Sequence, residues 1–470
     1  MDNKNYDLIV LGSGPGGEKA AVKAAYFGYK VAVVEVAGLY GGAEVITGTL
    51  PSKTLKETAL FLSGKQEKGM FSIERDLSRK ASIEDFMFRK NLITATESLA
   101  IGENLKRHGV DVYHGLGSFE DLHTISVSAP SNCSITADFI LIATGSYPYH
   151  PSHIPFDGIR VHDSDTILQI KRFPKSLCVV GAGVIGSEYA TIFSTVGSKV
   201  YLVNDKADIL SFLDHDITDE FLVQIREGGI ETIFNQAVKS VEVPQSETDP
   251  LRITLSNEQV LETDMFLLAA GRSGNVKALA LDKVGIPIGP REQIFVNTEY
   301  RTKVPHIFAV GDVIGFPALA STSMEQGRIA VAHMFNTQDL EHSTLFFPYG
   351  IYTIPEISMV GMTEEEVRKT GAPYVIGKAL YADMPRGKIM GAQRGFLKLV
   401  ILRENLTIRG VHVIGNIATE IIHYGTHLVE EKKDLYYLIS QVFNYPTFHD
   451  LYKYAAYDAL SALAGRKMKP

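Results

Sequence analysis

Two glycine-rich segments with the same layout constrain the fold of this chain more than any other feature. In the first, an apolar run over 7–11 leads into the sequence GSGPGG, and a second apolar run over 31–34 ends at Glu35. In the second, the run over 177–180 leads into GAGVIG, and the run over 200–203 ends at Asn204 at the same spacing. Each copy predicts a strand, a helix and a parallel strand joined by a dinucleotide-binding turn.

Each glycine of such a fingerprint has its own physical role. The first permits a tight turn, the second lets a pyrophosphate approach the backbone, and the third lets the helix pack closely on the strand. The N-terminus of the helix then offers free N–H groups to the phosphates. A single copy is a weak signal, because glycines are common in ordinary turns, but two copies in full context predict two nucleotide sites. We therefore expect six glycines to form them: Gly12, Gly14, Gly17, Gly181, Gly183 and Gly186.

Each copy closes with another strand-like run and a glycine turn, at 140–145 and at 266–271. A further apolar run over 307–310 leads into Gly311 and Asp312. With 470 residues the chain is too long for one ordinary domain of ~100–200 residues. We therefore predict an α/β protein with two dinucleotide-binding domains.

The C-terminal part follows another pattern. From about Phe347 no glycine fingerprint occurs, and an alternating run over 396–401 with an amphipathic tail over 451–463 predicts an α+β domain. His423 and His427 have the spacing of two ligands on one helix face, but no Glu or Cys stands at a zinc-motif offset. We predict no metal site.

Composition excludes several classes of function. The net charge of −8 makes nucleic-acid binding unexpected. No apolar run approaches the ~20 residues that a membrane span needs, and the first residues lack the layout of a secretory signal. Two cysteines, Cys133 and Cys178, are too few for a disulfide scaffold. We expect a cytoplasmic protein that binds neither membrane nor nucleic acid.

The motifs quoted above resemble those of the FAD-dependent pyridine nucleotide–disulfide oxidoreductases over essentially the full chain. The resemblance implies a homodimer with three domains: an FAD-binding domain over 1–150 and 273–346, an NAD(P)-binding domain over 151–272 and a dimerisation domain over 347–470. It implies that Glu35 binds the adenosine ribose of FAD and that Asp312 meets its ribityl chain. It also implies cofactor contacts at further motif positions: Gly42, Thr49, Thr144, Gly145, Gly271, Arg272, Gly311 and Ala320.

The redox motif of that family, G-G-T-C-x4-C-x-P-S-K, keeps its frame here but has lost both cysteines. Glu44 and Thr49 stand in their places. Thiol–disulfide exchange needs a thiolate, which neither a carboxylate nor a hydroxyl replaces. Cys133 and Cys178 lie elsewhere in the sequence. Disulfide substrates are therefore excluded.

A second motif has changed in the same sense. Disulfide reductases of the family carry His-x4-Glu near the C-terminus, where the histidine is an acid/base for the thiols. Here Tyr445 stands at the histidine position and Asp450 at the glutamate position, next to His449. We retain Tyr445 and Asp450 as candidate catalytic residues. For His449 we favour a surface or interface role over one at the flavin edge of a partner subunit.

Several segments resemble the soluble transhydrogenase branch of the family. These are the threonine at position 49, the sequence FNYPT at 443–447 and the sequence GIYTIPEIS at 350–358. One difference is Glu44, where that branch keeps a cysteine. We interpret Glu44 as a position without function or as a surface charge. We rank a third interpretation, an acid near the flavin, below these two, because nothing in the sequence gives Glu44 a partner.

The resemblance also supplies the catalytic candidates. Lys53 matches the family lysine near flavin N5, and Glu188 matches its ion-pair partner. A fixed cation at that place favours the anionic reduced flavin.

Nucleotide choice depends on Asn204. An acid at this position accepts a ribose hydroxyl and repels a 2′-phosphate, whereas asparagine keeps hydrogen-bonding capacity without the repulsion. Lys206 offers a point charge to a 2′-phosphate, and Asp205 opposes it. We expect both NAD and NADP to bind.

Together these residues predict an FAD-dependent oxidoreductase that moves hydride from one pyridine nucleotide to the other without a redox disulfide. The alternative is an NAD(P)H oxidase or a quinone or metal reductase. A third interpretation is a redox-sensing FAD protein or a non-catalytic partner subunit, which the retained Lys53, Glu188, Glu35 and Asp312 argue against.

Overall fold

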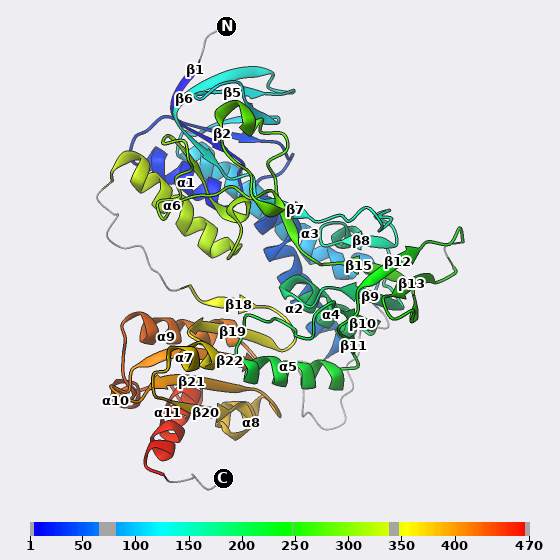
Figure 1. The fold of residues 1–470 in the computed structure, drawn as a ribbon, viewed down its shortest axis with the longest axis vertical. Coiled ribbons are helices and arrows are strands. Elements are labelled where there is room, and N and C mark those ends of the chain that lie inside the picture. Colours follow the sequence, from blue (N-terminus) through cyan, green and yellow to red (C-terminus); the bar gives the residue numbers. More distant parts are fainter. Residues whose placement is uncertain (1–3, 65–80, 247, 338–346, 466–470) are drawn as a thin grey trace.

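The computed structural model describes residues 4–64, 81–246, 248–337 and 347–465. In Figure 1 three sheets follow one another: the first near the N-terminus, the second to one side, and the third near the C-terminus. The predicted boundary between 346 and 347 lies at the edge of a stretch outside the described residues.

The first sheet has the strand order β3-β2-β1-β6-β5-β4, with β17 also paired to β6. β1, β2, β3, β6 and β17 are parallel, and β4 and β5 form an antiparallel edge. Its strands are β1 (Lys4–Leu11), β2 (Val31–Glu35), β3 (Asp111–His114), β4 (Gly117–Phe119), β5 (Thr124–Val127), β6 (Cys133–Ile142) and β17 (Ile307–Ala309).

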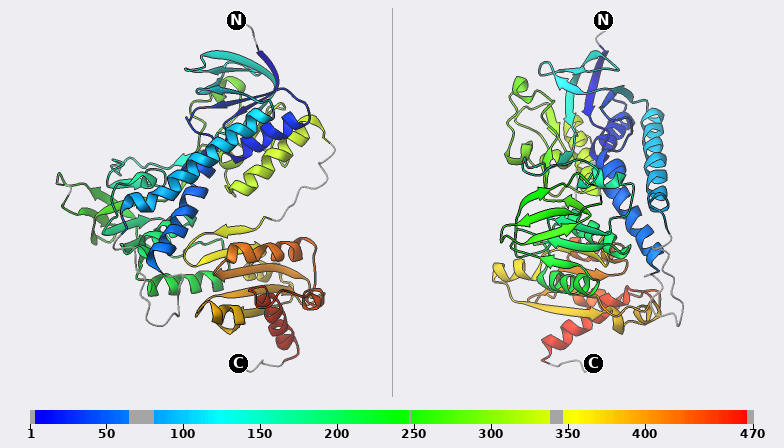
Figure 2. Two further views of the ribbon diagram at one scale, coloured as in Figure 1. Left: turned by 180° about the vertical axis from the view of Figure 1, so that it is seen from behind. Right: turned by 90° about the vertical axis from the view of Figure 1, so that its right-hand side faces the viewer.

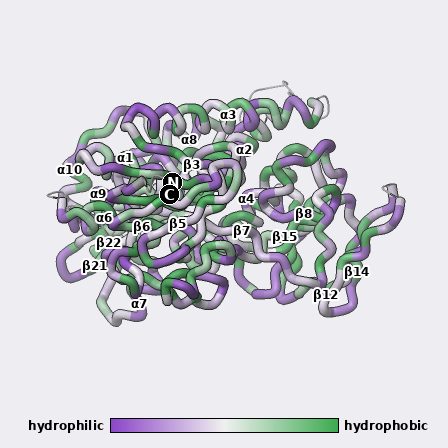
Figure 3. Tube along the Cα trace, turned by 90° about the horizontal axis from the view of Figure 1, so that it is seen from above, coloured by the Kyte–Doolittle hydropathy of each residue, from purple (hydrophilic) through white to green (hydrophobic). Residues whose placement is uncertain are grey.

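Four helices accompany this sheet: α1 (Pro15–Tyr26), α2 (Thr49–Ser63), α3 (Ile83–Arg107) and α6 (Ala320–Phe335). α1 and α6 pack side by side. The first fingerprint copy, from Gly12 to Gly145, is longer than the second, from Gly181 to Gly271, because α2 and α3 stand between its strands β2 and β3. Both helices run from the first sheet towards the second (Figure 2). Figure 3 places α3 along one edge of the molecule, where its tube alternates between hydrophilic and hydrophobic residues.

The second sheet is parallel, with the order β11-β10-β9-β15-β8. Its elements are β8 (Val161–Asp163), β9 (Ser176–Val180), α4 (Val184–Thr195), β10 (Lys199–Val203), α5 (His215–Glu227), β11 (Glu231–Ile233) and β15 (Met265–Leu268). A small antiparallel sheet flanks it: β12 (Val238–Glu242), β13 (Leu251–Leu255) and β14 (Val260–Thr263). β7 (Ser146–Pro148) and β16 (Arg272–Gly274) pair where the chain enters and leaves this part.

The third sheet is antiparallel, with the order β18-β19-β22-β21-β20. Its strands are β18 (Tyr349–Ile351), β19 (Glu356–Gly361), β20 (Tyr374–Leu380), β21 (Phe396–Leu402) and β22 (Ile408–Gly415). Its helices are α7 (Glu364–Thr370), α8 (Pro385–Ile389), α9 (Ala418–Glu430), α10 (Leu435–Ser440) and α11 (Asp450–Leu463). The predicted α+β character of this part is confirmed.

The described residues also form short helical turns: η1 (Ala43–Thr47), η3 (Thr166–Gln169), η4 (Leu281–Val284), η5 (Pro290–Glu292), η6 (Gly311–Ile314) and η8 (Tyr381–Asp383). The predicted α/β fold with two fingerprint units is confirmed, because each glycine turn joins a central parallel strand to a helix. Among the described residues no helix is long and apolar enough to cross a membrane.

Candidate functional site

One large cavity of about 1920 Å³ lies between the three parts of the molecule. Its walls include both glycine turns, most of the segment 42–53 and residues of β18 and α9. A usual small-molecule pocket has roughly 300–1,000 Å³. The cavity therefore has room for more than one ligand.

The two glycine turns share one geometry. Gly12 and Gly181 have φ angles of +103° and +104°, a region that side chains rarely adopt. A Cβ atom on Gly17 would lie 2.1 Å from the carbonyl oxygen of Gly12, and one on Gly186 would lie 1.8 Å from that of Gly181. The first and third glycines are therefore needed for the turn and for the helix–strand contact.

The second glycine of each turn faces open space. A Cβ atom on Gly14 or Gly183 would meet nothing within 4 Å. These two residues are the N-caps of α1 and α4, and neither helix has a side-chain cap. Both glycines and the first residues of both helices line the cavity. Free N–H groups at a helix N-terminus attract phosphate, so each turn fits the pyrophosphate of a dinucleotide.

The Glu35 side chain is fixed beside the first turn. One carboxylate oxygen accepts hydrogen bonds from the backbone N–H and the hydroxyl of Ser13 at 2.8 and 2.6 Å, and the other accepts from the N–H of Ala37 at 2.8 Å. Glu35 is buried but lines the cavity. This geometry suits the predicted contact with a ribose.

Lys53 and Glu188 form an ion pair between α2 and α4. The Lys53 Nζ lies 2.9 Å from each carboxylate oxygen of Glu188. The Glu188 side chain is 4% exposed, whereas that of Lys53 is 24% exposed. Both residues line the cavity. The pair therefore presents a partly open ammonium group to any ligand there.

Tyr352 contacts both members of this ion pair, a role that the sequence did not predict. Its backbone N–H donates to Glu188 at 3.0 Å, and its ring centroid lies 4.9 Å from the Lys53 Nζ. Ser52 also donates its hydroxyl to Glu188 at 3.2 Å. Tyr352 belongs to the motif at 350–358, but a motif gives no information about which side chains it contacts.

Arg272 links the connecting strands to the cavity wall. Its Nε donates to the Ser146 hydroxyl at 2.8 Å, and its Nη1 donates to Ser164 at 3.0 Å and to Asp165 at 3.1 Å. Ser146 in turn donates to Asp312 at 2.9 Å. Burial raises the pKa of Asp165, and the charge of Arg272 opposes that rise. The network fixes the Asp312 side chain at the cavity.

The Asn204 side chain bonds to backbone groups at the end of β10. Its Oδ1 accepts from the N–H of Ala182 at 3.2 Å, and its Nδ2 donates to the carbonyl oxygens of Lys206 and Asp208 at 3.2 and 2.9 Å. Oδ1 keeps a second lone pair for a hydroxyl. Asn204 and Lys206 both line the cavity.

Glu44 lies in the turn η1 and lines the cavity. Burial raises the pKa of its carboxyl group, Glu18 and Glu97 raise it further, and Lys19 lowers it. The interpretation of Glu44 as a surface charge is therefore wrong. It is a half-buried acid in the wall of the candidate site.

Most other predicted site residues also line the cavity: Gly42, Thr49, Thr144, Gly145, Gly271, Gly311 and Ala320. Gly17 and Gly186 do not, because they are buried in helix–strand contacts. Tyr445 and Asp450 also lie outside the lining, and Tyr445 is 74% exposed. The structure does not bring these last two residues to the cavity of their own chain.

The described residues offer neither a thiol in this cavity nor a cluster of metal ligands. Among its described lining residues there is no cysteine. Cys178 is buried in β9, and burial raises the pKa of its thiol to about 12. The described part of the chain contains no group of three or more His, Cys, Asp or Glu side chains that could hold a metal ion.

Comparison with protein families gives two matches. A model described as "Pyridine nucleotide-disulphide oxidoreductase" matches residues 6–327, and the model of that family's dimerisation domain matches residues 347–456.

Individual proteins resemble the chain over nearly its whole length. A soluble pyridine nucleotide transhydrogenase of Mycobacterium bovis is 41% identical, with 98% of each chain covered. The one of Marinomonas sp. is 38% identical, with 97% of this chain and 98% of the relative covered. Among solved structures, the HOCl-induced flavoprotein disulfide reductase RclA of Escherichia coli, as a Cu(II) complex, has a TM-score of 0.87 at 26% identity, with 98% and 100% covered. LpdA of Mycobacterium tuberculosis also has a TM-score of 0.87, at 25% identity, with 97% and 99% covered.

Proposed function

Because this chain belongs to the pyridine nucleotide-disulphide oxidoreductase family, we propose that it is an FAD-dependent pyridine nucleotide transhydrogenase. The reaction is NADPH + NAD⁺ → NADP⁺ + NADH, so that one hydride changes carrier and no net proton is consumed. One observation carries the proposal: two open glycine turns share a single cavity with the Lys53–Glu188 pair, and no cysteine occurs among the described lining residues.

FAD, when bound, supplies a two-electron carrier that accepts hydride from one nicotinamide and returns it to another. The first turn and Glu35 are the residues that would hold this group, since Gly14 is open to a pyrophosphate and Glu35 to a ribose. Asp312 and Ser146 would hold its polar chain.

Lys53 has an electrostatic task in this proposal. Its ammonium group is fixed by Glu188 before any ligand binds, so it needs no reorganisation to stabilise negative charge beside it. Glu188 is in turn fixed by Ser52 and by the backbone of Tyr352. The assignment of Lys53 and Glu188 as catalytic residues is part of the proposal.

The second turn would bind both nicotinamide nucleotides in sequence. Asn204 brings no negative charge to the adenosine ribose. Lys206 offers a positive charge nearby, and the neighbouring Asp205, which also lines the cavity, opposes it. With one such site, NADP⁺ has to leave before NAD⁺ binds, which gives ping-pong kinetics. The relatives named soluble pyridine nucleotide transhydrogenases support this exchange.

The active molecule in this proposal is a homodimer, which the match to the family's dimerisation domain supports. The proposed domains are 1–150 with 273–346 for FAD, 151–272 for NAD(P) and 347–470 for dimerisation. Tyr445 and Asp450 would act at the flavin of the partner subunit. The soluble relatives support a cytoplasmic location.

The test is anaerobic hydride transfer from NADPH to an NAD⁺ analogue with a distinct absorption spectrum, at catalytic concentrations of the purified protein. We expect sustained turnover with parallel initial-rate lines. If NADPH bleaches the flavin but the analogue stays oxidised, transhydrogenation is refuted, and rapid oxygen or quinone consumption would identify an oxidase or a quinone reductase instead.

A further inference from the structure

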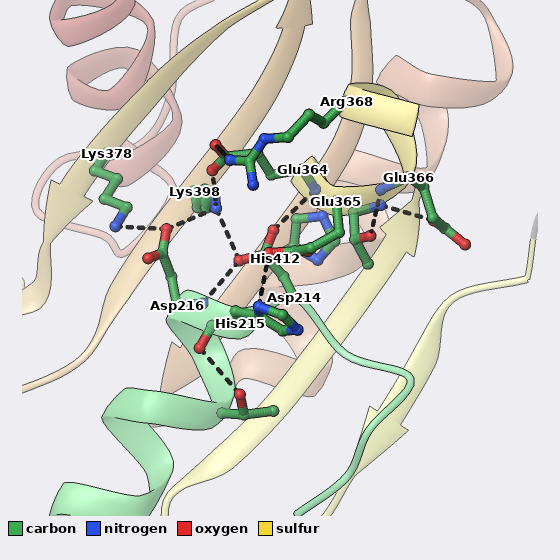
Figure 4. Close-up of polar contacts among 12 residues, drawn as sticks. Asp214, His215, Asp216, Glu364, Glu365, Glu366, Arg368, Lys378, Lys398 and His412 are labelled. Atoms are coloured by element: carbon green, nitrogen blue, oxygen red, sulfur yellow. Dashed lines mark hydrogen bonds and ion pairs between the residues drawn. The ribbon is translucent and has the colours of Figure 1, made fainter. Parts of the chain in front are cut away.

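A buried lysine holds α5 against the third sheet. Lys398 in β21 has a side chain that is 1% exposed, and its Nζ donates to three carboxylates: Asp214 at 2.8 Å, Asp216 at 2.6 Å and Glu364 at 2.7 Å (Figure 4). An ammonium group has three donors. All three are therefore used at this one contact.

Asp214 joins two helices as well as the ammonium group. It is the N-cap of α5, where its Oδ1 accepts from the N–H of Asp216 at 3.1 Å. Its Oδ2 accepts from the N–H of Glu364, the first residue of α7, at 3.0 Å. One fully buried carboxylate thus accepts hydrogen bonds from the N-termini of two helices, which belong to different parts of the molecule. We call Lys398, Asp214, Asp216 and Glu364 the Lys398 clamp.

Neighbouring cations balance the charge of the clamp. Asp216 also forms an ion pair with Lys378 at 2.7 Å, and Glu364 forms one with Arg368 at 2.7 Å. Burial raises the pKa of Asp214, but the neighbouring His412 and the hydrogen bonds from Lys398 and from the Glu364 N–H hold it below the ordinary value. The clamp is therefore fully ionised at neutral pH.

The clamp stands at the end of a cavity wall. The segment 204–213 runs from the end of β10 to Asp214, and Asn204, Lys206 and Phe212 within it line the cavity. The N–H of Leu210 donates to the carbonyl oxygen of Ala182 in the second glycine turn at 3.0 Å. Displacement of Asp214 would consequently move the wall that faces the second nucleotide site.

We propose that Lys398 is a positioning residue for the nicotinamide-nucleotide site. By fixing Asp214 and Asp216 to the third sheet, it fixes the wall segment 204–213, and with it the second glycine turn, relative to Lys53. This inference rests on the proposed function, because it assigns the second turn to the nicotinamide nucleotide. Lys398 lies outside the cavity lining and acts through Asp214.

The same interface offers a matched control. Arg394 lies 2.6 Å from Glu227 and 3.5 Å from Glu220, both on α5, and its side chain is 41% exposed. These contacts lie further along α5 than the clamp. An exposed pair of this kind contributes little, because solvent screens it. Arg394→Met should leave the wall segment unchanged.

The experiment compares Lys398→Met, Arg394→Met and the wild type as purified flavoproteins. Anaerobic rapid mixing with NADH and with NADPH gives a dissociation constant and a limiting rate of flavin reduction per bound FAD. For Lys398→Met we expect weaker binding of both nucleotides and a limiting rate lower by roughly tenfold or more, because a small misplacement of reacting groups is costly. Arg394→Met should match the wild type.

Hydrogen exchange supplies a readout that does not depend on catalysis. We expect faster amide exchange over 204–213 in Lys398→Met and unchanged exchange in Arg394→Met. If Lys398→Met fails to fold, Asp216→Asn replaces it, since that side chain is 38% exposed and its loss loosens the clamp from one side. The same direction of change, with smaller size, is expected.

Two outcomes separate the possible errors. A Lys398→Met protein with a lower melting temperature, but with wild-type nucleotide binding, reduction rate and exchange over 204–213, overturns the positioning role. If the wild-type flavin itself is reduced by neither nucleotide, the proposed function is wrong. In that case the hydrogen-exchange comparison alone decides whether the clamp holds the wall.

Discussion

The ammonium nitrogen of Lys53 lies 2.9 Å from both carboxylate oxygens of Glu188. These residues come from α2 and α4, and the backbone of Tyr352 donates to the same carboxylate. All three parts of the molecule therefore meet at one ion pair. Because the carboxylate is almost fully buried and each oxygen is hydrogen-bonded, the position of Lys53 is set before any ligand enters.

Lys53→Ala should slow the reduction of bound FAD by NAD(P)H without releasing the cofactor. Loss of one fixed electrostatic contact at a reacting centre costs about 10²–10³-fold in rate. Anaerobic stopped-flow absorbance measures the rate, and the ratio of flavin to protein absorbance measures FAD content. Lys239→Ala is the control, because Lys239 forms an exposed ion pair with Glu258. A colourless Lys53→Ala protein would show that the role of Lys53 is structural instead.

The two open glycines allow the two nucleotide sites to be separated. Gly14→Ala and Gly183→Ala each add a methyl group that meets no protein atom within 4 Å, so both proteins should fold. Gly14→Ala should lose FAD, because the methyl group occupies the path of the pyrophosphate. Gly183→Ala should keep FAD but bind NADH and NADPH at least roughly tenfold more weakly, a loss of about 1.4 kcal/mol.

Flavin content and nucleotide titration measure these two effects. Gly17→Ala is the contrasting variant, since its Cβ atom would lie 2.1 Å from the Gly12 carbonyl oxygen, and it should lower the melting temperature as well. Loss of FAD from Gly183→Ala, with retention by Gly14→Ala, would reverse the assignment of the two turns.

Asn204→Asp should weaken the binding of NADPH more than the binding of NADH. The new carboxylate would repel a 2′-phosphate, and it would face the carbonyl oxygens of Lys206 and Asp208, to which Asn204 now donates. We expect the ratio of KM values, NADPH over NADH, to rise roughly tenfold or more, a difference of about 1.4 kcal/mol, because the repulsion acts on the 2′-phosphate that NADPH alone carries. Lys206→Met should raise the same ratio less. An equal rise in the KM values for NADPH and NADH would show that Asn204 only holds the turn.

The sequence was sufficient for the parts of the fold that depend on local pattern. Each glycine turn follows a run of apolar residues, and burial of the central strands on both faces makes those runs continuous. The pairing of Lys53 with Glu188 came from the family resemblance, because no spacing rule connects positions on two separate helices. Tyr352 was missed for the same reason.

Lys398 shows a second limit. The alternating run at 396–401 gives no sign that its lysine is fully buried, since lysine is almost never buried without partners. Its partners, Asp214, Asp216 and Glu364, come from two distant segments. Only the folded structure brings these charges together, and the half-buried position of Glu44 likewise depends on how η1 packs.

Glu44→Gln should stabilise the protein at neutral pH. Burial raises the pKa of the Glu44 carboxyl in the folded state, so the folded protein binds this proton more tightly than the unfolded chain does. The stability gained from the protonated form is fully present below the unfolded pKa of about 4.3 and is lost as pH rises through the folded pKa. Glutamine has no charge to bury, so the variant avoids this loss.

Thermal unfolding of the flavoprotein should therefore give a higher melting temperature for Glu44→Gln than for the wild type at pH 7–8, with the difference vanishing towards pH 4. Glu404→Gln, at an exposed turn, is the control and should show no such trend. Equal melting temperatures at pH 7–8 would mean that Glu44 is charged without cost, and that its carboxylate finds a partner once the cofactor is bound.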